Sequence, residues 1–113
     1  MQILVLAGWG EEELVRAIVP LHPGARSFAE PPGLRTTFAL VAASDLVVCH
    51  SSLLLHVAAA FARPALALLG PSFRSASQHQ AQWGYPGLCH SLALPSPAEV
   101  LGLVREELDR CAR

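Results

Sequence analysis

The sequence predicts an α/β fold: a three-layer Rossmann-like domain with a parallel sheet of four or five strands and helices on both faces. Apolar runs short enough for buried strands alternate with longer runs of helical spacing, which is the pattern of βαβ units. Hydrophobic residues make up 52% of the chain and charged residues only 15%, which favours a sheet buried on both faces. The length of 113 residues fits a single domain, residues 1–113.

The first part of the chain is predicted to hold two strands and two helices. Residues 3–7 form an apolar run typical of a buried strand, and residues 25–29 are a candidate short strand. The helix expected at residues 11–19 carries three acidic residues in its first turn, where the helix dipole favours them. After the rigid Glu-Pro-Pro-Gly turn at residues 30–33, a second helix is expected at residues 34–43.

The central segment is predicted to fold as strand, turn, helix and strand. Residues 45–49 and 65–69 are apolar runs typical of buried parallel strands. Residues 53–62 consist mainly of Leu and Ala, which favour helix, and Pro64 stops that helix. A βαβ unit is therefore expected here, with its turn between the first strand and the helix.

The remainder of the chain is predicted to contain a long loop, an edge strand and a helix. Residues 71–87 are expected to form a loop with one helical turn near residues 77–82. A short edge strand is expected within residues 88–94. Ser96-Pro97-Ala98-Glu99 is a capping box with proline at the first helical position, so the last helix is expected at residues 97–111.

Composition excludes several classes of function. A net charge of −1 provides no basic surface for nucleic acid or an anionic membrane. Three widely spaced cysteines form neither a disulfide framework nor a zinc motif, so neither a metal nor a cofactor is expected, and Cys49 is interpreted as an inert buried residue. Residues 53–69, the longest apolar region, are interrupted by His56 and Arg63, so no membrane span is expected.

Two further features of the sequence concern its origin and location. All eight basic residues are arginine, which together with the many alanines is associated with GC-rich bacterial coding sequences. The first residues carry no basic segment typical of a signal peptide, so a cytoplasmic location is expected.

The predicted turn at residues 50–53 is the strongest site candidate. Ser51 or Ser52 would cap the following helix, where free backbone N–H groups and the helix dipole favour anions. In parallel sheets ligands bind at the carboxyl ends of the strands, which would gather four segments at one rim. These are residues 8–11, 30–34, 50–53 and 70–73.

The segment from Leu34 to Pro71 resembles the second Rossmann-like domain of glycosyltransferase family 9, the ADP-heptose:lipopolysaccharide heptosyltransferases. The family pattern is an Asp-Leu-Val-Val strand, an Asp-Ser/Thr-Gly-x-x-His turn, a helix continuing as Ala-Ala-Ala, a proline, and a strand ending in Gly-Pro-Thr/Ser. The corresponding residues are Asp45 to Val48, Ser51 to His56, Ala58 to Ala60, Pro64, and Gly70 to Ser72. The strand and glycines that precede Glu11 and Glu12 are also similar.

The resemblance implies half of a GT-B architecture that binds a nucleotide sugar, by analogy ADP-heptose, for transfer to a lipopolysaccharide-type acceptor. It implies no metal, no cofactor and no catalytic residue in this chain. The implied binding residues are Gly8, Gly10, Glu11, Ser51, Ser52, Leu53, His56, Gly70 and Ser72. The family's aspartate and glycine are replaced by Ser51 and Leu53, and family members carry a second domain, so the chain is expected to be a fragment or a shortened relative that does not catalyse transfer alone.

Simpler interpretations remain open for the same residues. Ser52 could be a plain helix cap, worth about 1 kcal/mol to the helix, and His56 a core histidine bonded to a carbonyl. Trp9 and Glu11 could pack on the base and bind the ribose, or be a surface aromatic and a dipole-favoured acid. Arg74 could pair with a phosphate or belong to an ordinary loop.

Two alternatives to donor binding also remain. The chain could be a degenerate, non-catalytic relative that serves as a binding or assembly module, pairing with a second copy or a partner through an open cleft face. It could instead be another nucleotide-sugar enzyme, such as an epimerase, on the same architecture. A hydrolase is not expected, because Ser51 and Ser52 lack the flanking glycines of a nucleophile elbow.

Overall fold

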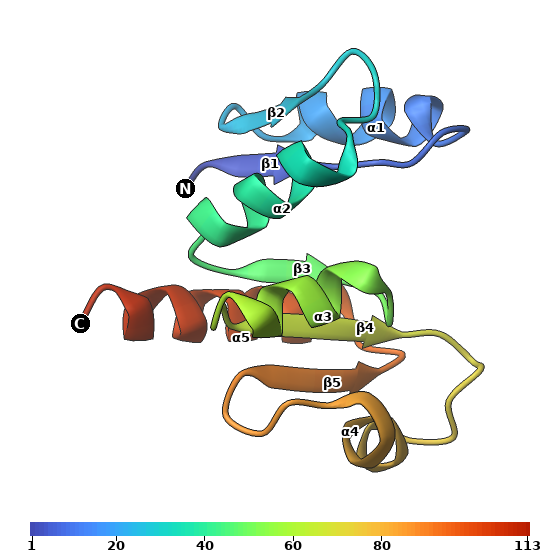
Figure 1. Ribbon diagram of the computed structural model, residues 1–113, viewed down its shortest axis with the longest axis vertical. Helices are drawn as coiled ribbons and strands as arrows, with labels where there is room; N and C mark the ends of the chain where they lie inside the picture. The colour runs from blue at the N-terminus through green and yellow to red at the C-terminus, as the bar shows by residue number, and fades with distance from the viewer. The chain divides into compact units, whose positions relative to one another are not determined.

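Five short strands alternate with helices along the chain in the computed structural model, which describes all 113 residues (Figure 1). Every strand pairing is parallel, and the predicted α/β class is confirmed. The strands form two hydrogen-bonded sheets, of two and three strands, where a single sheet was expected from the sequence. The chain divides into two compact units, Met1–Thr37 and Phe38–Arg113, each of which is described by itself.

The first unit, Met1–Thr37, is a small βαβ motif. Strand β1 (Ile3–Val5) pairs with β2 (Ala25–Ser27) in parallel register, and α1 (Glu12–Ile18) connects them. A 3₁₀ turn, η1 (Val19–Leu21), extends α1 because Pro20 has no N–H group to continue the α-helical ladder. Each predicted element is present, although β1, β2 and α1 are shorter than expected from the sequence.

Helix α2 (Leu34–Ala43) contains the boundary between the two units. Its bounds are those predicted from the sequence. It begins directly after the Pro-Pro-Gly turn, and the Thr37 amide donates to the Gly33 carbonyl at 2.9 Å. Within the second unit, Val41 is its buried residue.

The second unit, Phe38–Arg113, is built on a three-stranded parallel sheet in the order β3-β4-β5. Strand β3 (Val47–Cys49) leads through α3 (Leu53–Ala60) to the central strand β4 (Ala65–Leu69). Strand β4 leads through α4 (Ala76–Trp83) to the edge strand β5 (Cys89–Ala93), and α5 (Pro97–Cys111) follows. Two consecutive βαβ units therefore place the carboxyl ends of three strands at one edge of the sheet.

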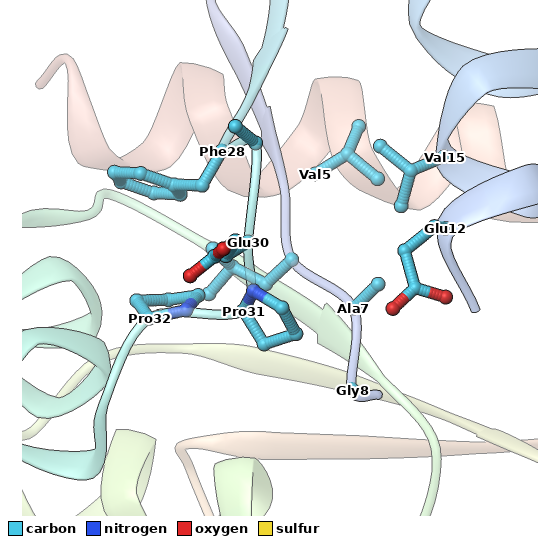
Figure 2. A pocket seen from close by; sticks show the side chains of 11 residues that line it. Val5, Ala7, Gly8, Glu12, Val15, Phe28, Glu30, Pro31 and Pro32 are labelled. Carbon is cyan, nitrogen blue, oxygen red and sulfur yellow. The ribbon is translucent and has the colours of Figure 1, made fainter. Parts of the chain in front are cut away.

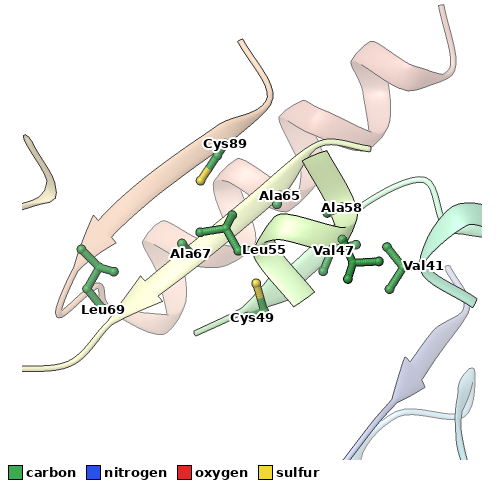
Figure 3. Packing of buried hydrophobic residues seen from close by; sticks show 10 residues of the cluster. Val41, Val47, Cys49, Leu55, Ala58, Ala65, Ala67, Leu69 and Cys89 are labelled. Atoms are coloured by element: carbon green, nitrogen blue, oxygen red, sulfur yellow. The ribbon is translucent and has the colours of Figure 1, made fainter. Parts of the chain in front are cut away.

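The core of this unit lies where α3 packs on β4. Leu55 and Ala58 of α3 and Ala67 of β4 are completely buried, and alanine at facing positions lets helix and strand approach closely (Figure 3). Cys49 also belongs to this cluster, and burial raises the pKa of its thiol to about 11. That environment favours the protonated thiol, and the predicted burial of Cys49 is confirmed.

Helix α5 is attached to β5 by a buried carboxylate. Glu107 is almost completely buried, and one of its oxygens accepts hydrogen bonds from His90 at 3.1 Å and Arg110 at 2.8 Å. At the other end of the helix, Ser96 Oγ accepts from the Glu99 amide at 3.2 Å, as the capping box predicted. No helix of the protein combines the length and apolar character needed to span a lipid bilayer.

Two predicted helix lengths were wrong. Helix α3 ends at Ala60 instead of Ala62, because Ala62 adopts a left-handed backbone with φ of 54°. The Arg63 amide donates to the Ala58 carbonyl and the Ala62 amide to the Ala59 carbonyl, which is the Schellman pattern of a helix end. Helix termination therefore precedes Pro64 by several residues.

The other wrong length concerns α4 (Ala76–Trp83), which occupies eight residues where a single helical turn was expected. Ser75 is its N-cap, and the Ser75 hydroxyl accepts from the Gln78 amide at 3.1 Å. The sequence here has a negative mean hydropathy and no apolar stripe, so its cap was the only available signal. The helix places His79 against the sheet, which matters for the site.

Candidate functional site

The turn between β3 and α3 presents unpaired hydrogen-bond donors at the carboxyl end of the sheet. Ser52 is the N-cap residue with an extended backbone, but its hydroxyl makes no capping hydrogen bond. The amides of Leu53 and Leu54 have no protein acceptor, whereas the Leu55 amide donates to the Ser52 carbonyl at 3.1 Å. The hydroxyl and the two amides are thus available to a ligand, and the plain-cap interpretation of Ser52 was wrong.

Ser51 is engaged differently from its neighbour. Its Oγ lies 2.9 Å from Nε2 of His79, and Nδ1 of the same imidazole lies 2.6 Å from Ser91 Oγ. The Ser91 hydroxyl in turn donates to Gln80 Oε1 at 2.9 Å. Ser51 therefore begins a chain of four polar groups that connects the β3–α3 turn, helix α4 and strand β5.

His79 is completely buried, which is unusual for a titratable side chain. Burial lowers the pKa of the imidazole from its ordinary value of 6.5, and the nearby charge of His56 lowers it further. The ring of Phe73 meets it edge-on, with centroids 4.8 Å apart. The neutral imidazole is therefore the dominant form at pH 7.

His56 lies one helical turn after Ser52 and is held by aromatic residues. Its Nδ1 lies 2.6 Å from the Tyr85 hydroxyl, and the rings of Tyr85 and Trp83 meet it in edge contacts at 5.7 and 6.2 Å. Its partner is thus a tyrosine hydroxyl and not a backbone carbonyl, so that interpretation of His56 was wrong. Nε2 of His56 has no protein partner and is free to bond a ligand.

Gly70 and Ser72 follow the carboxyl end of β4, and both are exposed. A Cβ atom at Gly70 would meet no other atom within 4 Å, so the backbone there faces open space. The next residue, Phe73, contacts His79 as described. The loop after β4 is thereby connected to the same polar cluster as the β3–α3 turn.

The other three predicted residues, Gly8, Gly10 and Glu11, lie together in the first unit. Glu11 Oε2 accepts from the Gly8 amide at 2.8 Å, and Glu12 Oε1 accepts from the Gly10 amide at 3.3 Å. Amide hydrogen bonds of Glu12 itself and of Gly10 lower the pKa of the Glu12 carboxyl. The two amides that could cradle a phosphate thus already have carboxylate partners.

A small pocket borders this loop within the first unit (Figure 2). Its lining includes Gly8 and Pro31 together with the side chains of Glu12 and Glu30. Two carboxylates in one small pocket favour a cationic or hydroxyl-bearing group over a phosphate. Glu11 does not line this pocket, and its carboxylate is bonded to the Gly8 amide.

The structure also reveals partners that the sequence analysis did not select. None of His79, Tyr85 and Ser91 was among the predicted binding residues. No group of three His, Cys, Asp or Glu side chains is arranged to hold a metal ion. The only sequence signal for His79 was its place four residues after Ser75. If Ser75 caps a helix, His79 lies within the second turn of that helix.

Comparison with known proteins gives one match. The sequence model of glycosyltransferase family 9 (heptosyltransferase) matches residues 1–82. Neither curated proteins nor solved structures gave a match. The matched residues include β1 to β4, the β3–α3 turn and His56, and most of α4. Because the match covers well over half of the chain, this protein belongs to glycosyltransferase family 9.

Proposed function

We propose that this chain binds the diphosphate of a nucleotide sugar at the β3–α3 turn, as the donor-binding part of a family 9 glycosyltransferase. By family analogy the donor is ADP-heptose and the acceptor is of the lipopolysaccharide type. The observation that carries the proposal is the set of unpaired donors formed by the Ser52 hydroxyl and the Leu53 and Leu54 amides. The proposal keeps the bacterial, cytoplasmic setting expected from the sequence.

The chemistry of the turn suits a leaving diphosphate. Backbone amides at a helix N-terminus, aligned with the helix dipole, stabilise negative charge without a metal ion. Nε2 of His56, one turn further along the same helix, adds a donor or acceptor for a phosphate or a sugar hydroxyl. Preorganised donors of this kind stabilise charge that develops on a leaving group during transfer.

The two departures from the family motif set limits on the affinity. Ser51 replaces a carboxylate, and its hydroxyl is occupied by His79 in the absence of a ligand. Leu53 replaces glycine, and its side chain is 53% exposed at the first helical position. A bulky side chain there keeps an anion from approaching the bare backbone, so we expect weak binding that improves when Leu53 is made smaller.

A non-catalytic binding or assembly module remains the second candidate. It is favoured by the carboxylates that occupy the Gly8 and Gly10 amides and by exposed apolar side chains such as Leu53 and Phe61. Such a module would associate with a second copy or a partner chain and would show no nucleotide binding. The state of association in solution separates the two candidates when measured beside the titration.

The test is a titration of the isotope-labelled chain with ADP and with UDP, followed through backbone amide shifts. We expect saturable shifts at Ser52, Leu53 and Gly70 with ADP. We also expect about tenfold weaker binding in Ser52→Ala, because a hydrogen bond to a charged group is lost. Ser77→Ala removes an exposed serine without hydrogen-bond partners and serves as the matched control. Flat spectra at millimolar ligand would overturn the proposal, and a preference for UDP would indicate a different nucleotide-sugar enzyme.

A further inference from the structure

In the chain of polar groups that begins at Ser51, the donor and the acceptor of each hydrogen bond can be assigned. Because the Ser91 hydroxyl donates its only proton to Gln80 Oε1, it can only accept from His79. His79 therefore carries its proton on Nδ1, and Nε2 is an unprotonated acceptor. At 2.9 Å from Nε2, the Ser51 hydroxyl must be the donor in that pair.

This is the arrangement of a serine nucleophile with its general base. The base lies within hydrogen-bond reach of the hydroxyl, and a third group, Ser91, fixes the tautomer and the orientation of the ring. Phe73 packs edge-on against the imidazole and limits its rotation. The acceptor atom therefore faces Ser51 before any ligand is bound.

Ser51 is also placed where a nucleophile would be accessible. It is exposed, and although it lacks the flanking glycines of a nucleophile elbow, it lies in a strand-to-helix turn as the serine of such an elbow does. The unpaired Leu53 and Leu54 amides follow directly in the same turn and can stabilise an oxyanion. Ser51 keeps an ordinary backbone with negative φ, so its position relies on the hydrogen bond to His79 and not on a strained turn.

We propose that Ser51 is a nucleophile activated by His79 and that it accepts an acyl group from an activated ester. In this step the Ser51 Oγ–carbonyl carbon bond forms and the ester C–O bond breaks. The Ser51 proton passes to His79 Nε2 and then to the departing alkoxide. Water, deprotonated by His79, completes the cycle by attacking the acyl-serine, which releases the acid and restores both side chains. This activity does not depend on donor binding.

The chain lacks one component of the serine-hydrolase triad, which determines the expected rate. Ser91 supports the productive tautomer but carries no negative charge to stabilise the imidazolium. In a serine protease, replacing the aspartate with its amide, which also favours the wrong tautomer, costs about 10⁴-fold in kcat. We therefore expect covalent modification with slow turnover and not efficient hydrolysis.

The experiment is covalent labelling of the full chain with a fluorophosphonate probe, with the modified residue located by peptide mass spectrometry. We expect the label on Ser51 and none in Ser51→Ala. Ser77→Ala, which changes an exposed serine without hydrogen-bond partners, should be labelled at the wild-type rate. Para-nitrophenyl acetate should give a burst of one nitrophenolate per chain, followed by slow release.

A second set of measurements tests the role of His79. His79→Gln should lower the labelling rate by about 100-fold or more, within the range of general-base catalysis. Because that variant removes a buried side chain, the pH profile of the wild-type chain provides a test that needs no mutation. The rate should fall below the pKa of His79, and the other titratable group near it, His56, is assessed by repeating the profile in His56→Ala. Labelling of Ser52 and Ser51 to equal extents, or a rate no greater than in Ser51→Ala, would overturn the proposal.

Discussion

The Tyr85 hydroxyl lies 2.6 Å from Nδ1 of His56, although 29 residues separate the two in sequence. Tyr85 also lies beyond residue 82, where the family match ends. The contact fixes the ring and leaves Nε2 free for a ligand.

The first prediction concerns that contact. Tyr85→Phe keeps the edge contact between the rings but removes the hydroxyl, so His56 can rotate away from the ligand. We expect ADP affinity to fall about fivefold, the equivalent of one ordinary hydrogen bond of about 1 kcal/mol. Calorimetric or NMR titration measures this. In a His56→Ala background the Tyr85→Phe change should have no further effect, and an undiminished effect there would show that the Tyr85 hydroxyl acts independently of His56.

The second prediction concerns the core under α3. Leu55 has no exposed surface, so Leu55→Ala should lower the free energy of unfolding by about 2–5 kcal/mol through lost burial and a residual cavity. Leu53→Ala, two residues earlier on the same helix, removes a half-exposed side chain and should change stability by less than about 0.5 kcal/mol. Urea unfolding of both variants distinguishes these outcomes. Equal losses would mean that the Leu53 side chain is buried in solution.

The third prediction concerns the end of α3. Ala62 adopts a left-handed backbone, with φ of 54°, which costs an L-residue about 1–2 kcal/mol. Ala62→Gly removes that strain but adds entropy to the unfolded chain, so we expect a net gain of about 0.5–1 kcal/mol. Ala60→Gly, within the last helical turn, should instead destabilise by about 0.5–1 kcal/mol. Thermal melts of the two variants should therefore shift in opposite directions.

The fourth prediction concerns pH. Burial lowers the pKa of His79 below its ordinary value of 6.5, so between the two values the unfolded chain binds more protons than the folded one. The contribution of this group to stability is complete above pH 6.5 and is lost as the pH falls through 6.5 toward the lowered pKa. Urea unfolding from pH 8 to 5 should show this slope. His79→Gln should lack the contribution of His79 to the pH dependence of stability. An unchanged slope in that variant would contradict a lowered pKa of His79.

Several element bounds could be predicted from the sequence because local chemistry decides them. The strand Ala65–Leu69 lies between Pro64 and Gly70, and the last helix begins at a capping box. The length of helix α4 was underestimated because its sequence has no apolar stripe. Only the N-cap residue Ser75 indicates where the helix begins. At the end of α3, Ala62 adopts a left-handed conformation that local propensity disfavours, so the predicted helix was too long.

The candidate site was predictable only where its residues are adjacent in the chain. Ser51, Ser52 and His56 share one turn and one helix, so motif spacing located them. The groups that determine their state lie far along the chain: His79 is 28 residues from Ser51, and Ser91 is 12 from His79. Such contacts arise from the crossover that returns α4 to the sheet, and no local pattern encodes them.

Helix α4 buries a single side chain, that of His79, and no apolar one. Its attachment to the sheet therefore depends mainly on the polar bonds of His79 and Gln80, with little hydrophobic driving force along its length. Elements held in this way open first in native-state hydrogen exchange, so the amides of α4 should exchange well before those of α3. Each opening separates the imidazole from Ser51, and the reactivity of that serine is then limited by how long the helix stays closed.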